Sequence, residues 1–225
     1  MKTVGLITIG QAPRPDLVAH LNLPDTIVTR SAGALDDVNP QELRHLFWHE
    51  HQEALPLVTR YGDHSVLLAN HALAPYLQRA VSRLQNDVDA VTILCTESFP
   101  QIESPVPYVR VDRLIEQSLN QGAEGRYIAA LVPTPGQIVP AEARWSLRGY
   151  ARAYDLPPNA DEDHIRQACA QLRDKLPHID CLVLDCMAYS RKEVAIAAET
   201  LHCAIIWPAE LLGRHLASLE QGGAS

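Results

Sequence analysis

Long apolar runs are missing from this sequence. No stretch of its 225 residues approaches the roughly 18 consecutive apolar residues that a membrane-spanning helix requires. An excess of basic residues is missing as well, because 19 Lys and Arg face 27 Asp and Glu, which gives a formal net charge of -8. Proteins that bind nucleic acid without sequence preference normally carry a basic surface. We therefore expect neither a membrane nor a nucleic acid as a partner.

The features of a secreted disulfide scaffold are also absent. The segment 1–10 contains one lysine and a short apolar stretch without a small-residue cleavage site, which is not the layout of a secretion signal. The five cysteines cannot all pair, and an odd count is more typical of a reducing compartment. We therefore expect a cytoplasmic protein.

Short apolar runs alternate with longer amphipathic segments along the chain. Strands are predicted at 4–9, 25–31, 65–70, 90–94, 127–132, 151–154, 181–184 and 203–207. Helices are predicted at 13–23, 40–60, 76–84, 112–120, 137–147, 162–176 and 192–201, with a last helix that begins at Pro208. Buried strands that alternate with helices predict an α/β fold with mostly parallel sheets.

The length suits either one large domain or two smaller lobes. Pro100, Pro105 and Pro107 interrupt the pattern of strands and helices. We expect an N-terminal α/β lobe over residues 1–105 and a C-terminal α/β lobe over residues 106–225, with a last helix that can pack across both.

Two loops that follow predicted strands carry a cysteine near their start. Ligands bind at the carboxyl ends of the strands in open α/β sheets, and there Cys95 follows the strand 90–94 while Cys186 follows the strand 181–184 and Asp185. A cysteine just before a helix N-terminus lies near backbone N–H groups, which lower its pKa and favour the thiolate. Each predicted lobe therefore carries one candidate catalytic thiol.

If the two predicted lobes face each other, Cys95 and Cys186 could flank one small carbon acid from opposite sides. One thiolate could remove a proton from a small carbon acid while the opposing thiol donates a proton to the other face, which inverts a stereocentre. The alternative is that Cys95 and Cys186 are core residues, because unpaired cysteine is among the most buried residue types. The other three lie within apolar patterns and are predicted to be structural: Cys169, Cys181 and Cys203.

Candidates for binding a substrate carboxylate lie in the same loops. Arg14 stands between two prolines directly after the first predicted strand, where its guanidinium could bind a carboxylate through two hydrogen bonds. The alternative for Arg14 is a salt bridge with Asp16. Gln11, Thr96 and backbone N–H groups after each cysteine are further candidates. Glu97 opposes formation of the neighbouring thiolate, but it could act as a base or bind a cationic group.

Metal and nucleotide motifs receive no support. Gly10 is expected at the end of the first strand because a tight turn favours glycine, but it has no Gly-x-Gly-x-x-Gly or phosphate-loop context. His45 and His49 lack the glutamate of a zinc-protease motif, and no cysteine pair has zinc-ribbon spacing. We predict no metal site.

Four segments carry a resemblance to a known family. They read Thr-Ile-Gly-Gln-Ala-Pro-Arg-Pro-Asp at 8–16, Cys-Thr-Glu-Ser-Phe-Pro at 95–100, Leu-Val-Pro at 131–133 with Gln137 and Trp145 downstream, and Leu-Asp-Cys-Met-Ala-Tyr at 184–189. The chain thereby resembles the AroM family, a branch of the aspartate/glutamate/hydantoin racemase superfamily, over nearly its whole length. The family's cysteine loops usually read Cys-Thr-Gly-Glu-Phe and Asp-Cys-Met-Gly-Tyr, so Glu97, Ser98 and Ala188 depart from the pattern.

The resemblance implies two Rossmann-like lobes related by pseudo-twofold symmetry, with the active site in the cleft between them. It also implies that Cys95 and Cys186 are the acid and base, and that no cofactor takes part. Amino-acid racemases of the superfamily commonly have Thr-His after the second cysteine, whereas Met187 and Ala188 follow it here. The residues expected around the substrate are Thr8, Gly10, Gln11, Arg14, Thr96, Glu97, Ser98, Thr134, Met187, Ala188 and Tyr189.

The expected function is a cofactor-independent racemase or epimerase of a small carboxylate, either an amino acid or a derivative. One alternative is a cysteine-dependent cis-trans isomerase or decarboxylase of a small dicarboxylate. Another is a regulatory protein that binds a carboxylate without turnover, which the changed residues Glu97, Ser98 and Ala188 make credible. The expected partner is the small-molecule carboxylate, and a homodimer is compatible with the sequence.

Overall fold

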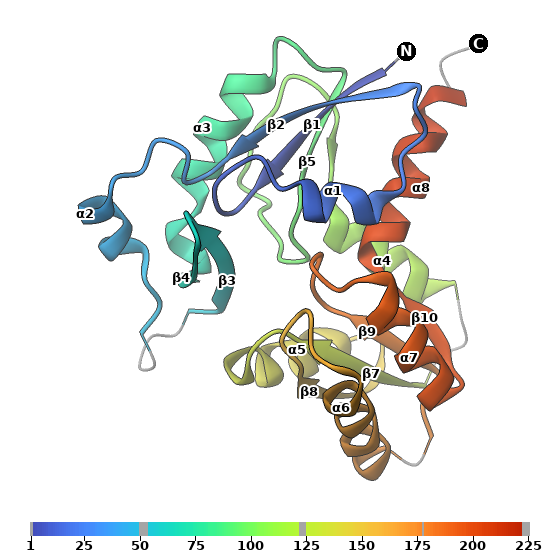
Figure 1. The fold of residues 1–225 in the computed structure, drawn as a ribbon. Helices are drawn as coiled ribbons and strands as arrows, with labels where there is room; N and C mark the ends of the chain where they lie inside the picture. Colours follow the sequence, from blue (N-terminus) through green and yellow to red (C-terminus); the bar gives the residue numbers. More distant parts are fainter. Residues whose placement is uncertain (1, 50–53, 122–124, 177, 222–225) are drawn as a thin grey trace. The chain divides into compact units, whose positions relative to one another are not determined.

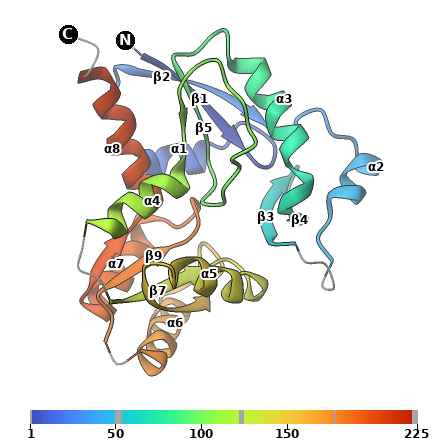
Figure 2. The ribbon, with the colours of Figure 1, turned by 180° about the vertical axis from the view of Figure 1, so that it is seen from behind.

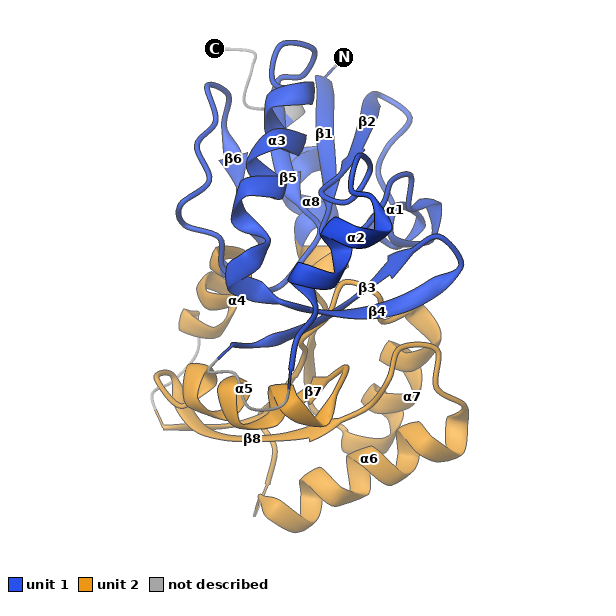
Figure 3. Ribbon diagram, turned by 90° about the vertical axis from the view of Figure 1, so that its left-hand side faces the viewer, with its two compact units in different colours: residues 1–112, 212–225 blue, residues 113–211 orange. Residues whose placement is uncertain are grey.

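The computed structural model of the protein describes residues 2–49, 54–121, 125–176 and 178–221 (Figure 1). The chain divides into two compact units. Unit 1 comprises residues 1–112 and 212–225, and unit 2 comprises residues 113–211 (Figure 3). Each unit is built on a four-stranded parallel sheet flanked by helices. The predicted α/β class with mostly parallel sheets is therefore confirmed.

The sheet of unit 1 has the strand order β2-β1-β5-β6. Its strands are β1 (Lys2–Thr8), β2 (Ile27–Gly33), β5 (Ala90–Ile93) and β6 (Tyr108–Val109). Its helices are α1 (Pro15–Leu21), α3 (Ala74–Leu84) and the part of α8 (Pro208–Gln221) from residue 212 onward, while α4 (Val111–Asn120) begins in this unit. Helices α3 and α8 lie on opposite sides of this sheet (Figures 1 and 2).

The sheet of unit 2 has the equivalent order β8-β7-β9-β10. Its strands are β7 (Arg126–Val132), β8 (Gly149–Asp155), β9 (Cys181–Leu184) and β10 (Ala204–Ile206). Its helices are η3 (Pro135–Gln137), α5 (Ile138–Trp145), α6 (Glu162–Lys175) and α7 (Arg191–Leu201). Helices α6 and α7 pack side by side on one face of the sheet, and α5 lies on the other (Figure 2).

The two sheets repeat one plan down to single hydrogen bonds. In unit 1, Asp89 accepts a hydrogen bond from the Thr3 backbone N–H at 2.7 Å and returns one from its own N–H to the Thr3 carbonyl at 2.8 Å. In unit 2, Asp180 and Tyr127 make the same two bonds at 2.7 and 2.9 Å. Strands β1 and β7, and strands β5 and β9, are therefore structural equivalents.

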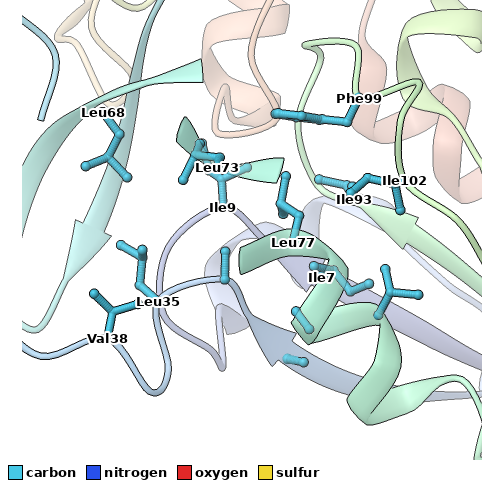
Figure 4. Close-up of a cluster of buried hydrophobic side chains, with 14 of the residues drawn as sticks. Ile7, Ile9, Leu35, Val38, Leu68, Leu73, Leu77, Ile93, Phe99 and Ile102 are labelled. Carbon is cyan, nitrogen blue, oxygen red and sulfur yellow. The ribbon is translucent and has the colours of Figure 1, made fainter. Parts of the chain in front are cut away.

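The main core of unit 1 lies between its sheet, α3 and a hairpin (Figure 4). Helix α3 buries Leu77, Ala80, Val81 and Leu84, whose spacing places them on one face of the helix. These side chains pack with residues from the strand ends and the loops that follow them, among them Ile7, Ile9, Ile93, Phe99 and Ile102. The core therefore supports the loops that leave β1 and β5.

The helix that we predicted over residues 40–60 is wrong. Only α2 (Pro40–Leu43) and the short 3₁₀ helix η1 (Arg44–Leu46) form there, and residues 50–53 lie outside the described chain. Strand β3 (Pro56–Tyr61) follows and pairs antiparallel with β4 (His64–Ala69), which η2 (Asn70–Ala72) links to α3. Leu57 and Thr59 are buried at every second position, a strand period, and Gly62 turns the hairpin with a positive φ of 57°.

Within the described part of the chain, no helix is both long enough and apolar enough to cross a membrane.

Candidate functional site

Cys95 begins the loop that leaves β5. The Leu94 N–H donates to the Ile7 carbonyl at 2.7 Å, and the Cys95 N–H donates to the Ile93 carbonyl at 2.8 Å. The chain then turns so that the Glu97 N–H donates to the Cys95 sulfur at 3.4 Å. The thiol is half-buried and has a backbone hydrogen-bond donor directed at it.

Cys186 occupies the equivalent position in unit 2. The Asp185 N–H donates to the Leu131 carbonyl at 2.8 Å, and the Cys186 N–H donates to the Leu184 carbonyl at 2.7 Å. The Ala188 N–H donates to the Cys186 sulfur at 3.4 Å, and this thiol is also half-buried. Both cysteine loops thus make the same three hydrogen bonds, each with an N–H that would stabilise a thiolate.

The other three cysteines have a different environment. Cys169 and Cys181 are buried in unit 2, as predicted, while Cys203 is half-buried at the start of β10. Burial raises the pKa of each of these three thiols to about 11. They are therefore protonated near neutral pH and are poor acid/base candidates.

The loop after β1 is fixed by the β3–β4 hairpin. The Gln11 N–H donates to the Arg60 carbonyl at 3.2 Å, and the Gln11 side-chain oxygen accepts from the Gly62 N–H at 2.7 Å. Gly10 lies so close to β3 that a Cβ there would stand 2.3 Å from Thr59 Oγ1 and 2.5 Å from the Arg60 carbonyl. Glycine at this position is therefore required by the hairpin, a contact that we did not predict.

An aspartate that sequence reasoning missed completes this loop. Asp36 accepts hydrogen bonds from the Ala12 N–H at 2.8 Å and the Gly33 N–H at 2.7 Å. Arg83 on α3 donates to the Gly33 carbonyl at 2.5 Å and also pairs with the Asp36 carboxylate. The loop continues through a cis peptide bond before Pro13. The segment after β1 is therefore tied to β2 and α3 as well as to the hairpin.

Arg14 is paired with Asp16, the alternative that we weighed against carboxylate binding. Its guanidinium donates from Nε at 2.9 Å and from Nη2 at 2.6 Å to the two oxygens of Asp16. These hydrogen bonds hold the pKa of the Asp16 carboxyl below its usual range. The Arg14 side chain is 13% exposed, so its guanidinium is held in one position at the start of α1.

Thr8, at the end of β1, is buried, and its hydroxyl has no hydrogen-bond partner among the described residues. Thr96, in the Cys95 loop, is buried as well, whereas Glu97 and Ser98 are half-buried. All of these residues, together with Gly10, Gln11 and Arg14, lie in unit 1, at the end of β1 or in the loops after the adjacent strands β1 and β5. The predicted residues of this unit therefore gather at one edge of its sheet.

An arginine beyond β6 holds the Cys95 loop. Arg110 donates to the Ser98 hydroxyl at 2.6 Å and to both oxygens of the buried Asp112, at 3.1 and 2.5 Å. Burial raises the pKa of nearby Tyr108, and the negative charges of Asp112 and Cys95 act in the same direction. Sequence reasoning missed these three residues because β6 has only two residues and no clear strand pattern.

In unit 2, the predicted residues divide between surface and core. Thr134 is half-buried, and its hydroxyl donates to the Gln137 side-chain oxygen at 3.3 Å. Ala188 is half-buried, whereas Met187 and Tyr189 are buried. The Tyr189 hydroxyl donates to the Leu156 carbonyl at 2.6 Å, and burial raises its pKa well above the usual value. Met187 and Tyr189 therefore anchor the Cys186 loop to the core.

Glu193 fastens the end of the Cys186 loop. Its buried carboxylate accepts from the Asn159 N–H at 2.7 Å and from the Ser190 N–H at 2.6 Å, and Ser190 caps α7 in return. We expect Glu193→Ala to lower the free energy of unfolding by about 2–3 kcal/mol, because two backbone donors lose their partner. Urea denaturation would measure the loss. Glu199→Ala, at an exposed position of the same helix, is the control and should cost less than about 0.5 kcal/mol.

No group of three or more His, Cys, Asp and Glu side chains among the described residues is arranged to hold a metal ion.

Solved structures of similar fold are enzymes that act on small molecules. Unliganded arylmalonate decarboxylase matches with a TM-score of 0.65 and 12% identity, covering 100% of this chain and 94% of its own. Glutamate racemase from Francisella tularensis in complex with D-glutamate matches with a TM-score of 0.60 and 13% identity, covering 98% and 81%. Allantoin racemase from Pseudomonas fluorescens matches with a TM-score of 0.60 and 12% identity, covering 99% and 92%. No curated protein matches the chain in sequence.

These likenesses define the class of fold, which is the one shared by arylmalonate decarboxylase and by glutamate, aspartate and allantoin racemases. The family follows from the sequence itself. The chain belongs to the AroM family, whose model, described as AroM protein, matches residues 4–219. The predicted resemblance is thereby confirmed.

Proposed function

We propose that the protein is a cofactor-independent racemase or epimerase of a small carboxylate, with Cys95 and Cys186 as its acid/base pair. The observation that carries the proposal is the matched geometry of the two cysteine loops. Each thiol follows an equivalent strand and accepts a hydrogen bond from the N–H two residues later. Two thiols in matched surroundings suit a reaction that has one proton transfer on each face of a carbon.

The proposed reaction uses the two thiols in turn. One cysteine, as thiolate, removes the proton from the carbon next to the carboxylate, and the electron pair is delocalised into that carboxylate. The other cysteine, as thiol, donates its proton to the opposite face of the same carbon. The product is the opposite stereoisomer, and the protonation states of the two cysteines are exchanged. The superfamily fold supports this proposal, since glutamate, aspartate and allantoin racemases share it.

Solvent-deuterium exchange tests the proposal directly. The protein would be incubated in D2O with single enantiomers of amino acids, hydantoins and hydroxy acids, and mass spectrometry and chiral chromatography would follow label and configuration. We expect deuterium at the α-carbon together with inversion for at least one class of compound. If no compound in the panel exchanges its α-proton in a cysteine-dependent way, racemisation is excluded as the function.

Decarboxylation of a small dicarboxylate is the second candidate. It is favoured by a difference between the loops, because the residue before the thiol is the apolar Leu94 in unit 1 and the buried carboxylate Asp185 in unit 2. A decarboxylase needs only one thiol: loss of CO2 leaves an enediolate, which that thiol protonates. Arylmalonate decarboxylase also has this fold. Release of CO2 from substituted malonates, in place of inversion, would identify this reaction.

Arg14 is the proposed partner of the substrate carboxylate, and Arg14→Lys is therefore expected to raise KM about tenfold with little change in kcat. Lysine keeps the charge but loses the two parallel hydrogen bonds of a guanidinium. Initial rates on the substrate identified by the exchange panel would measure both constants. Arg30→Lys, at an exposed position of β2, is the matched control and should change neither constant.

Because Arg14 is paired with Asp16, a variant of Asp16 is expected to have a different effect on KM from Arg14→Lys. Asp16→Asn removes the carboxylate that now competes for the guanidinium, so KM is expected to fall or stay constant. A rise of KM in Asp16→Asn equal to that in Arg14→Lys would assign the pair to the stability of α1 and not to substrate binding.

A further inference from the structure

We propose that Asp185 and Arg144 form a positioning pair for Cys186 that makes the two cysteines chemically unequal, with the charges of the pair setting how readily Cys186 ionises. This inference rests on the proposed function, in which Cys186 is an acid/base group. It goes further by assigning roles to two residues that do not themselves touch the reacting atoms.

A comparison of the two cysteine loops shows that an aspartate precedes the cysteine only in unit 2. The cysteine loops share their backbone hydrogen bonds, yet Leu94 occupies the place that Asp185 takes in unit 2. Leu94 is buried and apolar, whereas Asp185 is equally buried and carries a carboxylate. The Cys95 loop is also held by an arginine, Arg110, but that arginine reaches it through Ser98 and pairs with an aspartate on a different segment. A charge on the residue directly before the thiol is therefore specific to Cys186.

Asp185 and Arg144 contact each other, and both contact the side chain of Trp145. One oxygen of Asp185 accepts from Arg144 Nη2 at 2.5 Å and from the Trp145 indole N–H at 2.9 Å. The Arg144 guanidinium lies over the Trp145 ring at 4.4 Å, and the Trp145 side chain is buried. Because both partners are consecutive residues at the end of α5, they connect this helix to the residue before the thiol. Movement of Cys186 relative to α5 would break these bonds.

Charged groups from several elements of unit 2 act on the Cys186 loop. Asp185 lies on the Cys186 loop and Arg144 on α5, while Asp155 ends β8 and Glu193 lies in the first turn of α7. Tyr189, buried on the same loop, is influenced by the negative charges of Cys186, Glu193, Asp185 and Asp155. Arg144 pairs with Asp185, so the loss of its positive charge has the opposite electrostatic effect to the loss of the Asp185 carboxylate.

Removal of each member of the pair should shift the ionisation of Cys186 in opposite directions. Asp185→Asn keeps an oxygen that accepts hydrogen bonds but leaves the positive charge of Arg144 uncompensated, which favours the thiolate. Arg144→Met keeps an unbranched chain over the Trp145 ring but leaves the carboxylate uncompensated, which disfavours the thiolate. Each shift is expected to be about one pH unit, as for charges close to a partly buried group.

The experiment is a titration of Cys186 by alkylation. The whole protein and its variants would be treated with iodoacetamide between pH 5 and 10, and peptide-resolved mass spectrometry would give the rate at each cysteine. We expect the apparent pKa of Cys186 to fall in Asp185→Asn and to rise in Arg144→Met. The apparent pKa of Cys95, measured in the same samples, should stay constant. It serves as an internal control that the substitutions leave unit 1 unchanged.

Matched controls separate this role from a structural one. Asp174→Asn and Arg173→Met remove the same charges from exposed positions of α6 and should shift neither cysteine. Shifts of Cys186 in the same direction in both pair variants, or no shift, would overturn the proposal, because a merely displaced loop does not follow the sign of the charge. If Asp185→Asn fails to fold, Arg144→Met decides alone: a rise supports the proposal and any other result rejects it. The titration needs no substrate, so it can succeed even if the exchange assay excludes racemisation.

Discussion

Cys186→Ser and Cys95→Ser are each expected to lower the rate of racemisation about a thousandfold. Serine is nearly isosteric with cysteine, but its hydroxyl is far less acidic than a thiol, so it can neither form the anion nor donate the proton at a useful rate. General acid/base groups contribute about 10²–10⁴-fold to rate, and the loss falls in that range. The measurement is inversion of an enantiomerically pure substrate followed by chiral chromatography.

The two variants should differ in what they retain. With one cysteine left, a substrate enantiomer whose proton faces that cysteine can still lose it and regain deuterium on the same face. Each variant should therefore exchange one enantiomer without inversion, and the two variants should select opposite enantiomers. Cys203→Ser, which changes a half-buried thiol outside both loops, is the control and should keep the full rate. Racemisation within threefold of wild type in either loop variant would remove that cysteine from the mechanism.

The architecture could be predicted from the sequence because its signal is local. Runs such as Val4–Ile9 and Ala90–Leu94 are apolar except for one threonine each, as suits strands covered on both faces, and amphipathic helices separate them. The position of both cysteines follows from the same signal, since each stands just after a buried strand. The family resemblance implied two lobes related by pseudo-twofold symmetry, but the agreement of the two loops in three hydrogen bonds came only from the structure.

The strand predicted at 65–70 corresponds to β4, but β3 and its pairing with β4 could not be predicted because packing contacts determine them. Apolar residues between 43 and 58 have no clean period, and they fit a helix about as well as a strand. What fixes the strand is packing: Leu57 and Leu68 are paired across the hairpin and join the core of unit 1. The same applies to Asp36 and Arg110, which became visible as loop supports only once the fold brought them to their partners.

Arg14 illustrates the limit for single side chains. The sequence placed it at the start of α1 with two alternatives, a substrate carboxylate or Asp16. The structure contains the pair with Asp16. The KM values of the two variants decide whether a substrate carboxylate replaces the Asp16 carboxylate. A local pattern can thus position a residue correctly while its partner depends on geometry and on the ligand.

Gly10→Ala is expected to be among the most destabilising single substitutions in the loops, lowering the free energy of unfolding by about 2–3 kcal/mol. The added methyl group would stand 2.3 Å from Thr59 Oγ1 and 2.5 Å from the Arg60 carbonyl, so either the hairpin or the loop after β1 must move. Such a movement would break the Gln11 hydrogen bonds to Arg60 and Gly62 as well. Urea denaturation monitored by circular dichroism would measure the change.

Two further variants identify the cause of that loss. Gly62→Ala places a methyl group in open space at a positive φ, so it carries only the backbone strain of about 1 kcal/mol. Thr59→Ala in the Gly10→Ala background removes one of the two close contacts but leaves the Arg60 carbonyl in place, so it should restore only part of the stability. If Gly10→Ala lowers the free energy of unfolding no more than Gly62→Ala does, close contact with the hairpin does not restrict residue 10. If Gly10→Ala lowers the free energy of unfolding more than Gly62→Ala does, and Thr59→Ala restores part of that loss, the hairpin holds the loop after β1 in position.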